Sequence, residues 1–169
     1  MVPDRRDLIM DVAERLIRTH GYNGFSFREI AAEVGVKSAS VHYHFPTKAE
    51  LATAVARRYR KKFEAKVQDA EANGGSPVAV WRDLFRRALR EDGRMCLCGI
   101  LAIEGDALPA PVAGEARAFL DYGIRSIAEA PDLNDADGAR VLAQLEGAML
   151  LARSFGDPEL FDRATQDLA

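Results

Sequence analysis

The chain has 169 residues, of which 48% are hydrophobic, and its formal net charge is −3. This length and composition suit a folded protein of one or two domains and exclude a wholly disordered chain. No apolar run reaches the roughly 18 residues of a membrane span, and the charged N-terminal segment lacks the apolar stretch of a signal peptide. We therefore expect a cytoplasmic protein that does not bind a membrane.

The charges are unevenly distributed along the chain. Residues 1–66 contain 13 Lys and Arg against 8 Asp and Glu, whereas residues 67–169 contain 10 against 18. A basic first part followed by an acidic remainder indicates that the first part alone faces a polyanion.

Apolar residues at helical spacing predict helices throughout the chain and no strand. The helices expected in the first part span residues 4–20, 26–34, 38–44 and 47–73. Ser26 with Glu29, and Thr47 with Glu50, have the spacing of capping boxes, in which each N-cap side chain and the side chain three residues later satisfy backbone N–H groups. Gly35 ends the second helix, because glycine adopts a positive φ angle at little cost.

The strongest boundary signal in the sequence is Asn73-Gly74-Gly75-Ser76-Pro77, where two glycines precede a capping serine and a proline. Beyond it we expect a helix with an apolar face over 80–89, an apolar segment over 95–107, helices over 111–130 and 135–155, and a last helix capped by Asp157-Pro158. The expected domains are residues 1–47, a connecting helix over 48–73, and residues 74–169.

Two short helices joined through a tight turn at Gly35 predict a helix-turn-helix over about residues 26–45. The DNA major groove admits one helix, and a second helix braces it across the backbone. The helix over 38–44 carries small or polar residues at its N-terminal end, where base edges would lie. We therefore expect this chain to bind double-stranded DNA as a dimer.

The residues of this region carry a family resemblance. The segments Phe25–Ala31, Gly35–Lys37 and Val41–Leu51, with the loop Gly21–Phe25 before them, resemble the DNA-binding domain of the TetR/AcrR family of bacterial transcriptional regulators. The resemblance covers about residues 5–60. It implies an all-α homodimer with an N-terminal three-helix DNA-binding domain that reads a palindromic operator. It also implies a C-terminal helical domain that binds an unknown small-molecule effector, dimerises and releases repression, with no cofactor and no enzymatic activity.

Carried over residue by residue, the resemblance implies DNA contacts at Ser26, Arg28, Lys37, Ser38, Ser40, His42, Tyr43, His44 and Lys48. Many members of the family have tyrosine in place of His42, so the contact at this position differs from theirs or depends on pH. The segment Met95–Leu101 with Glu104 and Leu108-Pro109 is similar to one branch of the family with short C-terminal domains. The last two long helices, including residues 147–152, are expected to form the dimer contact.

The effector site is expected among apolar walls with a few polar groups. Its candidate residues are Trp81, Phe85, Cys96, Glu104, Phe119 and Tyr122. At helical spacing the aromatic residues also suit plain core packing, and this alternative stays open.

Cys96 and Cys98 have three interpretations. They are small core residues, which we prefer, or a thiol switch that senses electrophiles or oxidants, or lining of the effector pocket. A zinc site is not expected, because no further cysteine exists, and His42 and His44 point apart on a helix. The rival class is a small helical enzyme or binding protein, but no nucleophile–base pair or phosphate loop is present.

Overall fold

The computed structural model describes residues 4–168, apart from the side chain of Asp92, and in this range it is all-helical with no strand. Residues 1–3 and 169, which the expected domain limits include, lie outside the described residues. The helices are α1 (Arg5–His20), α2 (Phe27–Val34), α3 (Ser38–His44), α4 (Lys48–Ala72), α5 (Pro77–Asp92), α6 (Leu97–Glu104), the short 3-10 helix η1 (Gly105–Ala107), α7 (Ala110–Ala128), α8 (Asp135–Phe155) and α9 (Glu159–Ala164). No helix in this range is long and apolar enough to cross a membrane.

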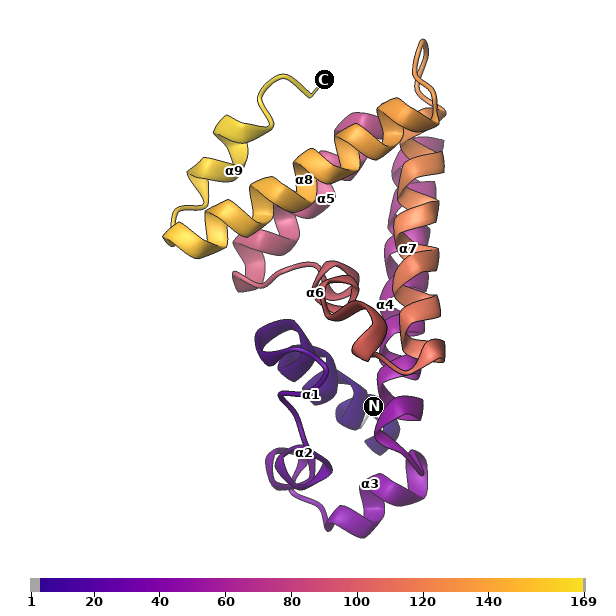
Figure 1. Ribbon diagram of the computed structural model, residues 1–169, viewed down its shortest axis with the longest axis vertical. Coiled ribbons are helices and arrows are strands. Elements are labelled where there is room, and N and C mark those ends of the chain that lie inside the picture. Colours follow the sequence, from indigo (N-terminus) through magenta and orange to yellow (C-terminus); the bar gives the residue numbers. More distant parts are fainter. Residues whose placement is uncertain (1–3, 169) are drawn as a thin grey trace.

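Helices α1, α2 and α3 form one end of the molecule (Figure 1). The long helix α4 leaves this end and packs along α7, while α8 packs against α5, α7 and α9. The molecule thus has two parts, the N-terminal part (α1–α3) and the C-terminal part (α5–α9), which α4 connects. Helix α6 lies between these two parts and contacts α1, α4 and α7. The hydrophobic core is continuous through both parts, since buried residues of α1, α4 and α6 belong to the same cluster.

The N-terminal helices begin and end where the sequence predicts. The capping box of α4 is complete, because Thr47 Oγ1 accepts a hydrogen bond from the Glu50 N–H and the Glu50 carboxylate accepts one from the Thr47 N–H. The predicted box of α2 forms only in part. Ser26 Oγ accepts from the Glu29 N–H at 3.3 Å, but the Glu29 carboxylate takes its hydrogen bond from the Ser26 hydroxyl rather than from the Ser26 N–H.

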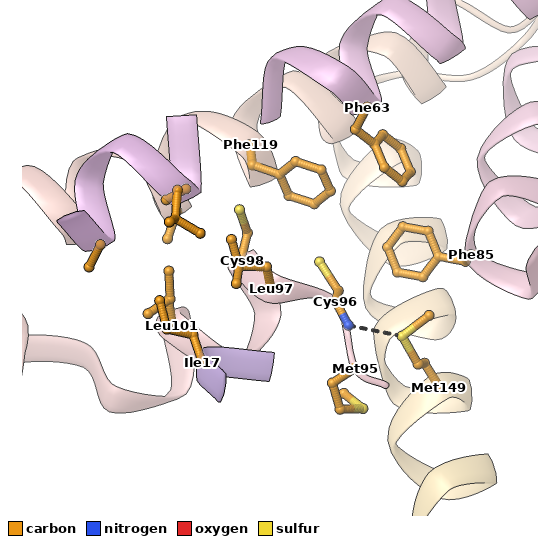
Figure 2. Packing of buried hydrophobic residues seen from close by; sticks show 14 of the residues in the cluster. Ile17, Phe63, Phe85, Met95, Cys96, Leu97, Cys98, Leu101, Phe119 and Met149 are labelled. Carbon is orange, nitrogen blue, oxygen red and sulfur yellow. Dashed lines mark hydrogen bonds between the residues drawn. The ribbon is translucent and has the colours of Figure 1, made fainter. Parts of the chain in front are cut away.

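The C-terminal part differs from expectation in its details. Helix α7 spans Ala110–Ala128 rather than 111–130, and the segment over 95–107 divides into α6 and η1. Two sulfur atoms accept the hydrogen bonds at the start of α6. The Cys96 N–H donates to Met149 Sδ at 3.1 Å (Figure 2), and the Gly99 N–H donates to Cys96 Sγ at 3.4 Å.

Candidate DNA-binding surface

The turn between α2 and α3 is built on Gly35. This residue is in the left-handed region, with φ 75° and ψ 35°, as the sequence predicts. Its N–H and that of Val36 both donate to the carbonyl of Ala31, which closes the last turn of α2. Val36 then packs, partly buried, against the hydrophobic core. The turn therefore holds α3 at a fixed angle to α2.

Helix α3 has one buried side and one exposed side. Val41 is fully buried and anchors the helix to the core. On the other side Lys37, Ser38 and Ala39 are exposed, and the Tyr43 side chain is 84% exposed. An exposed aromatic residue of this size beside a lysine and a serine is a surface suited to phosphate oxygens and base edges.

The two histidines of α3 have different surroundings. The His42 ring lies edge-on to the Phe27 ring, with centroids 4.6 Å apart, and its Nδ1 is 3.4 Å from the Pro46 carbonyl oxygen. His44 is half-buried, and its ring contacts Tyr43 at a centroid distance of 5.3 Å. Among residues 4–168 no group of three His, Cys, Asp or Glu residues is placed to hold a metal ion.

Lys48 directs its ammonium group inward. Its Nζ donates to the Phe25 carbonyl oxygen at 2.7 Å and lies 4.4 Å from the centroid of the Phe25 ring. Burial lowers the pKa of Lys48, while the carboxylates of Glu104 and Glu29 oppose that shift. The Ser26 hydroxyl is likewise used internally, against Glu29. Nine residues were expected to contact DNA. Six of them are exposed: Ser26, Arg28, Lys37, Ser38, His42 and Tyr43. The other three, Ser40, His44 and Lys48, are half-buried.

Comparison with known proteins agrees with this geometry. The sequence profile of bacterial regulatory proteins of the tetR family matches residues 9–55. A TetR-family transcriptional regulator from Agrobacterium tumefaciens is 31% identical, with 96% of this chain and 94% of that chain aligned at a TM-score of 0.86. The chain belongs to the TetR family. A TetR transcriptional regulator from Legionella pneumophila aligns at 29% identity and a TM-score of 0.88, over 99% of this chain and 96% of that one.

The transcriptional repressor AcnR of Corynebacterium diphtheriae is 32% identical over 88 residues, which are 52% of this chain and 44% of that protein. The chain thus matches less than half the length of the curated relatives it resembles. These relatives are transcriptional regulators, and the helix-turn-helix of this TetR-family protein lies in the matched region.

Among the residues predicted for the effector site, Trp81, Phe85 and Phe119 lie in the packed core. Four buried aromatic rings pack against one another: Phe63, Trp81, Phe85 and Phe119. The centroid of the Phe63 ring lies 4.9 Å from that of Trp81 and 5.1 Å from that of Phe119. Tyr122 joins this aromatic cluster at its edge, 5.9 Å from Trp81. In this structure of the TetR-family protein, these aromatic side chains are packed as core residues, which is the alternative to an effector site that the sequence left open.

Both thiols are also buried. Figure 2 shows the Cys96 and Cys98 side chains inside the packed core near Phe119 and Leu97. Burial raises the pKa of each thiol, and the nearby Glu146 carboxylate raises it further. A reactive cysteine needs access and a lowered pKa, and the structure supplies neither. The thiol-switch interpretation is therefore not favoured.

Glu104 lies apart from the aromatic cluster, at the C-terminal end of α6. Its Oε1 accepts a hydrogen bond from the Tyr22 N–H at 2.5 Å, and its Oε2 accepts one from Asn23 Nδ2 at 3.1 Å. The carboxylate thus holds the loop between α1 and α2, so the two parts of the TetR fold are joined at this point. Glu104 also lines a hollow with Ile103 and Leu150, apart from the aromatic residues predicted beside it.

Further contacts between the two parts were not predicted from the sequence. Arg18 is buried at the end of α1, and its Nε donates to the Met95 carbonyl at 2.8 Å. In return, Arg153 of α8 donates to the Arg18 carbonyl at 3.1 Å. The last turn of α1 is therefore bonded both to the segment before α6 and to α8. The available sequence signal was only a basic residue at the end of an apolar stripe.

A second unpredicted set involves α4 and α7. Glu115 of α7 accepts hydrogen bonds from Arg57 at 2.6 Å and from Arg60 at 3.1 and 3.0 Å. Burial alone would raise the pKa of Glu115, but the two guanidinium groups outweigh it and hold that pKa below its usual value. Charge-assisted hydrogen bonds of this kind fix the register of α4 against α7.

Glu146 is a buried carboxylate in the middle of α8. Both of its oxygens are inaccessible to solvent and have no nitrogen or oxygen donor, so the nearby Cys96 thiol is the polar group beside them, although the residue as a whole is partly exposed. The carboxylate lies against Gly99 of α6, where a Cβ atom would be only 2.5 Å from Oε2. Burial raises the pKa of Glu146 to about 7, and the Cys96 side chain opposes the shift. A charged residue within a helix rich in alanine, leucine and methionine was the signal that could have identified it.

Proposed function

We propose that this protein is a homodimeric transcriptional repressor that binds a palindromic operator and is released from it by a small-molecule effector. The observation that supports the proposal most directly is the exposed side of α3, which presents Lys37, Ser38 and Tyr43 while Val41 anchors the opposite side. The related AcnR of Corynebacterium diphtheriae is a transcriptional repressor.

In this proposal the residues divide into those that touch DNA and those that position them. Arg28, Lys37 and Tyr43 contact phosphates, while Ser38 and Ser40, with His42 and His44 beside them, lie at base edges. Ser26 and Lys48, whose polar atoms are engaged within the chain, orient the start of α2 and the Phe25 loop. The role of Lys48 is thus to hold the reading surface in shape.

The dimer is proposed to form through α7 and α8. Helix α8 exposes Leu150, Leu151 and Phe155, the last of which is 75% exposed. Gly147, one turn earlier, has no atom within 4 Å of the position its Cβ would occupy. Large exposed apolar residues around a small one allow close approach of a second helix. Two copies then present two α3 helices, which must lie about 34–36 Å apart or at a multiple of that distance to read one operator.

Effector release is proposed to act through α4. We place the domain limits at residues 1–47, 48–73 and 74–169, so that α4 joins the DNA-binding part to the effector-binding and dimerisation part. An effector near the aromatic cluster of Trp81 and Phe119 contacts Phe63 of α4 and changes the tilt of that helix. A ligand shifts such an equilibrium only by its difference in affinity for the two states.

The test is binding of purified protein to the DNA upstream of its own gene, measured by fluorescence anisotropy over a range of salt concentrations. We expect a specific complex that weakens with salt, because phosphate contacts release counterions. Tyr43→Ala weakens binding to all sequences, whereas Ser40→Ala changes the preference among operator variants. Ala65→Ser, on an exposed part of α4 away from α3, is the matched control. Absence of a specific, salt-sensitive complex at physiological ionic strength would refute the proposal.

A further inference from the structure

A hollow lies between α1, α4 and α5, and Phe63 of the aromatic cluster forms part of its floor. It has a volume of about 280 Å³. Its residues come from the second half of α1, the middle of α4 and the second half of α5. The hollow therefore has walls from both parts of the molecule.

The floor of the hollow is apolar and aromatic. Phe63 and the ring of Tyr59 come from α4, and Leu84 and Ala88 come from α5. Tyr59 is held in place, because its hydroxyl faces the buried Cys96 and the guanidinium of Arg18, which also lines the hollow, lies 5.9 Å from the centroid of its ring. The floor is thus rigid and suited to a hydrocarbon or aromatic body.

The rim of the hollow is predominantly basic. Lys62 and Lys66 lie one turn apart on α4, and Arg87 faces them from α5. None of these three forms an ion pair with another side chain that the structure describes. The rim also contains Glu91 and Glu14, but Glu14 is already bonded to Arg58 at 3.1 Å. Three cations without a protein partner above an apolar floor are complementary to an anion with an apolar body.

We propose that this hollow binds a small anionic amphiphile. Its carboxylate or phosphate head is held by Lys62, Lys66 and Arg87, and its apolar body rests on Phe63 and Leu84. The volume of about 280 Å³ lies just below the roughly 300–1,000 Å³ range of ligand pockets, so the ligand is a short chain or a single ring system rather than a large drug. A cationic ligand is disfavoured by the same rim.

The bound molecule joins two elements that otherwise meet little. It contacts α5 on one side and α1 on the other, and α1 is the helix against which α2 packs. Occupancy of the hollow therefore favours one spacing of α1 relative to α5. An effect of this spacing on DNA affinity rests on the proposed function. The binding of the anion to the hollow does not depend on that function.

Binding is tested without DNA, so that its failure is distinct from failure of the repressor function. The chain has a single tryptophan, Trp81, whose ring centroid lies 4.9 Å from that of Phe63 in the floor. Sodium decanoate is titrated below its micelle concentration while the Trp81 emission and the thermal midpoint are recorded. We expect a saturable emission change and a raised midpoint with decanoate, because a ligand that binds only the folded state stabilises it. Decyltrimethylammonium, which has the same chain and the opposite charge, gives neither.

Two variants and a control separate the site from general hydrophobic binding. Lys62→Gln/Lys66→Gln weakens decanoate binding at least about tenfold, because charge-assisted contacts to the carboxylate are lost. Ala88→Leu fills the hollow and reduces binding without lowering the thermal midpoint of the free protein. Lys61→Gln, on an exposed face of α4 outside the hollow, leaves binding unchanged. Equal binding of the cation, or undiminished decanoate binding by the double variant, would overturn the proposal.

Discussion

The Glu104 carboxylate of α6 accepts a hydrogen bond from the backbone N–H of Tyr22, 82 residues earlier in the chain, at 2.5 Å. The same carboxylate accepts a hydrogen bond from Asn23, and a Cβ at Gly21 would lie 2.5 Å from Glu104 Oε1, so a side chain there would displace the carboxylate. The loop that leads into the helix-turn-helix is therefore fixed from the C-terminal part of the fold.

This contact leads to a prediction about Glu104→Ala. The variant leaves the Tyr22 N–H without its acceptor, so we expect the free energy of unfolding to fall by about 1–2 kcal/mol. DNA affinity falls more than stability alone explains, because the α1–α2 loop loses its anchor. Urea denaturation and anisotropy measure the two effects. Asp106→Ala, an exposed acidic neighbour, is the control and changes neither; a loss of stability with unaltered DNA affinity would show that the contact is structural only.

Lys37→Ala tests whether Lys37, at the start of α3, contacts a DNA phosphate. One fewer phosphate contact per subunit lowers the slope of log affinity against log salt concentration by about 0.9 per contact, with little change in sequence preference. The slope is obtained from anisotropy titrations at several salt concentrations. Lys61→Ala, far from α3 on α4, keeps the wild-type slope. An unchanged slope in Lys37→Ala would remove Lys37 from the DNA contacts.

Glu146 predicts a pH dependence of stability. Its pKa is raised from 4.5 in the unfolded chain to about 7 in the folded one. Between these values the folded state holds a proton that the unfolded state has lost, so the contribution of Glu146 to the free energy of unfolding falls as pH rises from about 4.5 to 7. Above pH 7 the cost is constant and amounts to roughly 3 kcal/mol.

Glu146→Gln removes this cost while keeping the shape of the side chain. The variant is expected to be more stable than the wild type at pH 8 and close to it at pH 5, as measured by urea denaturation at both values. Glu129→Gln, an exposed residue at the end of α7, serves as the matched control and shows the same difference from wild type at both pH values. Parallel pH profiles for wild type and Glu146→Gln would contradict the shifted pKa.

The cysteines are predicted to be unreactive in the folded protein. Both are buried with a raised pKa, so a water-soluble disulfide reagent reacts with them only as fast as the core opens. Labelling of the native protein is therefore slow and becomes fast in concentrated guanidinium chloride. Cys96→Ala/Cys98→Ala leaves the DNA response to oxidants unchanged. Rapid labelling under native conditions would reopen the thiol-switch interpretation.

Gly147→Glu tests the proposed dimer face. The side chain enters open space in the single chain, so folding is retained, but it places a charge where the second copy would pack. We expect light scattering to give the monomer mass for this variant and the dimer mass for the wild type. Ala65→Glu, on the exposed side of α4, stays dimeric. A dimeric Gly147→Glu would move the interface elsewhere.

The sequence predicts the helices of this protein well because their ends are marked by local chemistry. Gly35, Thr47 with Glu50, and the run from Asn73 to Pro77 act through their nearest neighbours along the chain, and the observed helices begin and end beside them. The start of α7 lies one residue before the predicted position, since Pro109 and Pro111 are both compatible with a first helical turn.

Contacts between distant segments of the chain cannot be predicted from helix-end signals or from the spacing of apolar residues. Lys48 has the position of a phosphate-binding residue, yet its ammonium binds Phe25, because the fold of α1 and α4 places a carbonyl and two rings within reach. The same holds for Glu104 and Arg18, whose partners lie more than 70 residues away. Periodicity states which face of a helix is apolar but not which polar group on another helix will meet it.

The start of α6 has a consequence for hydrogen exchange. Thioether and thiol sulfur are weak acceptors, so the Cys96 and Gly99 amides are held less firmly than amides bonded to oxygen. These amides are therefore expected to exchange with solvent deuterium earlier than their burial suggests, followed by the rest of this eight-residue helix. Since α6 touches α1, α4 and α7, its unwinding by one turn removes support from both parts of the fold at once. These two amides thus lie where the DNA-binding end meets the remainder of the chain.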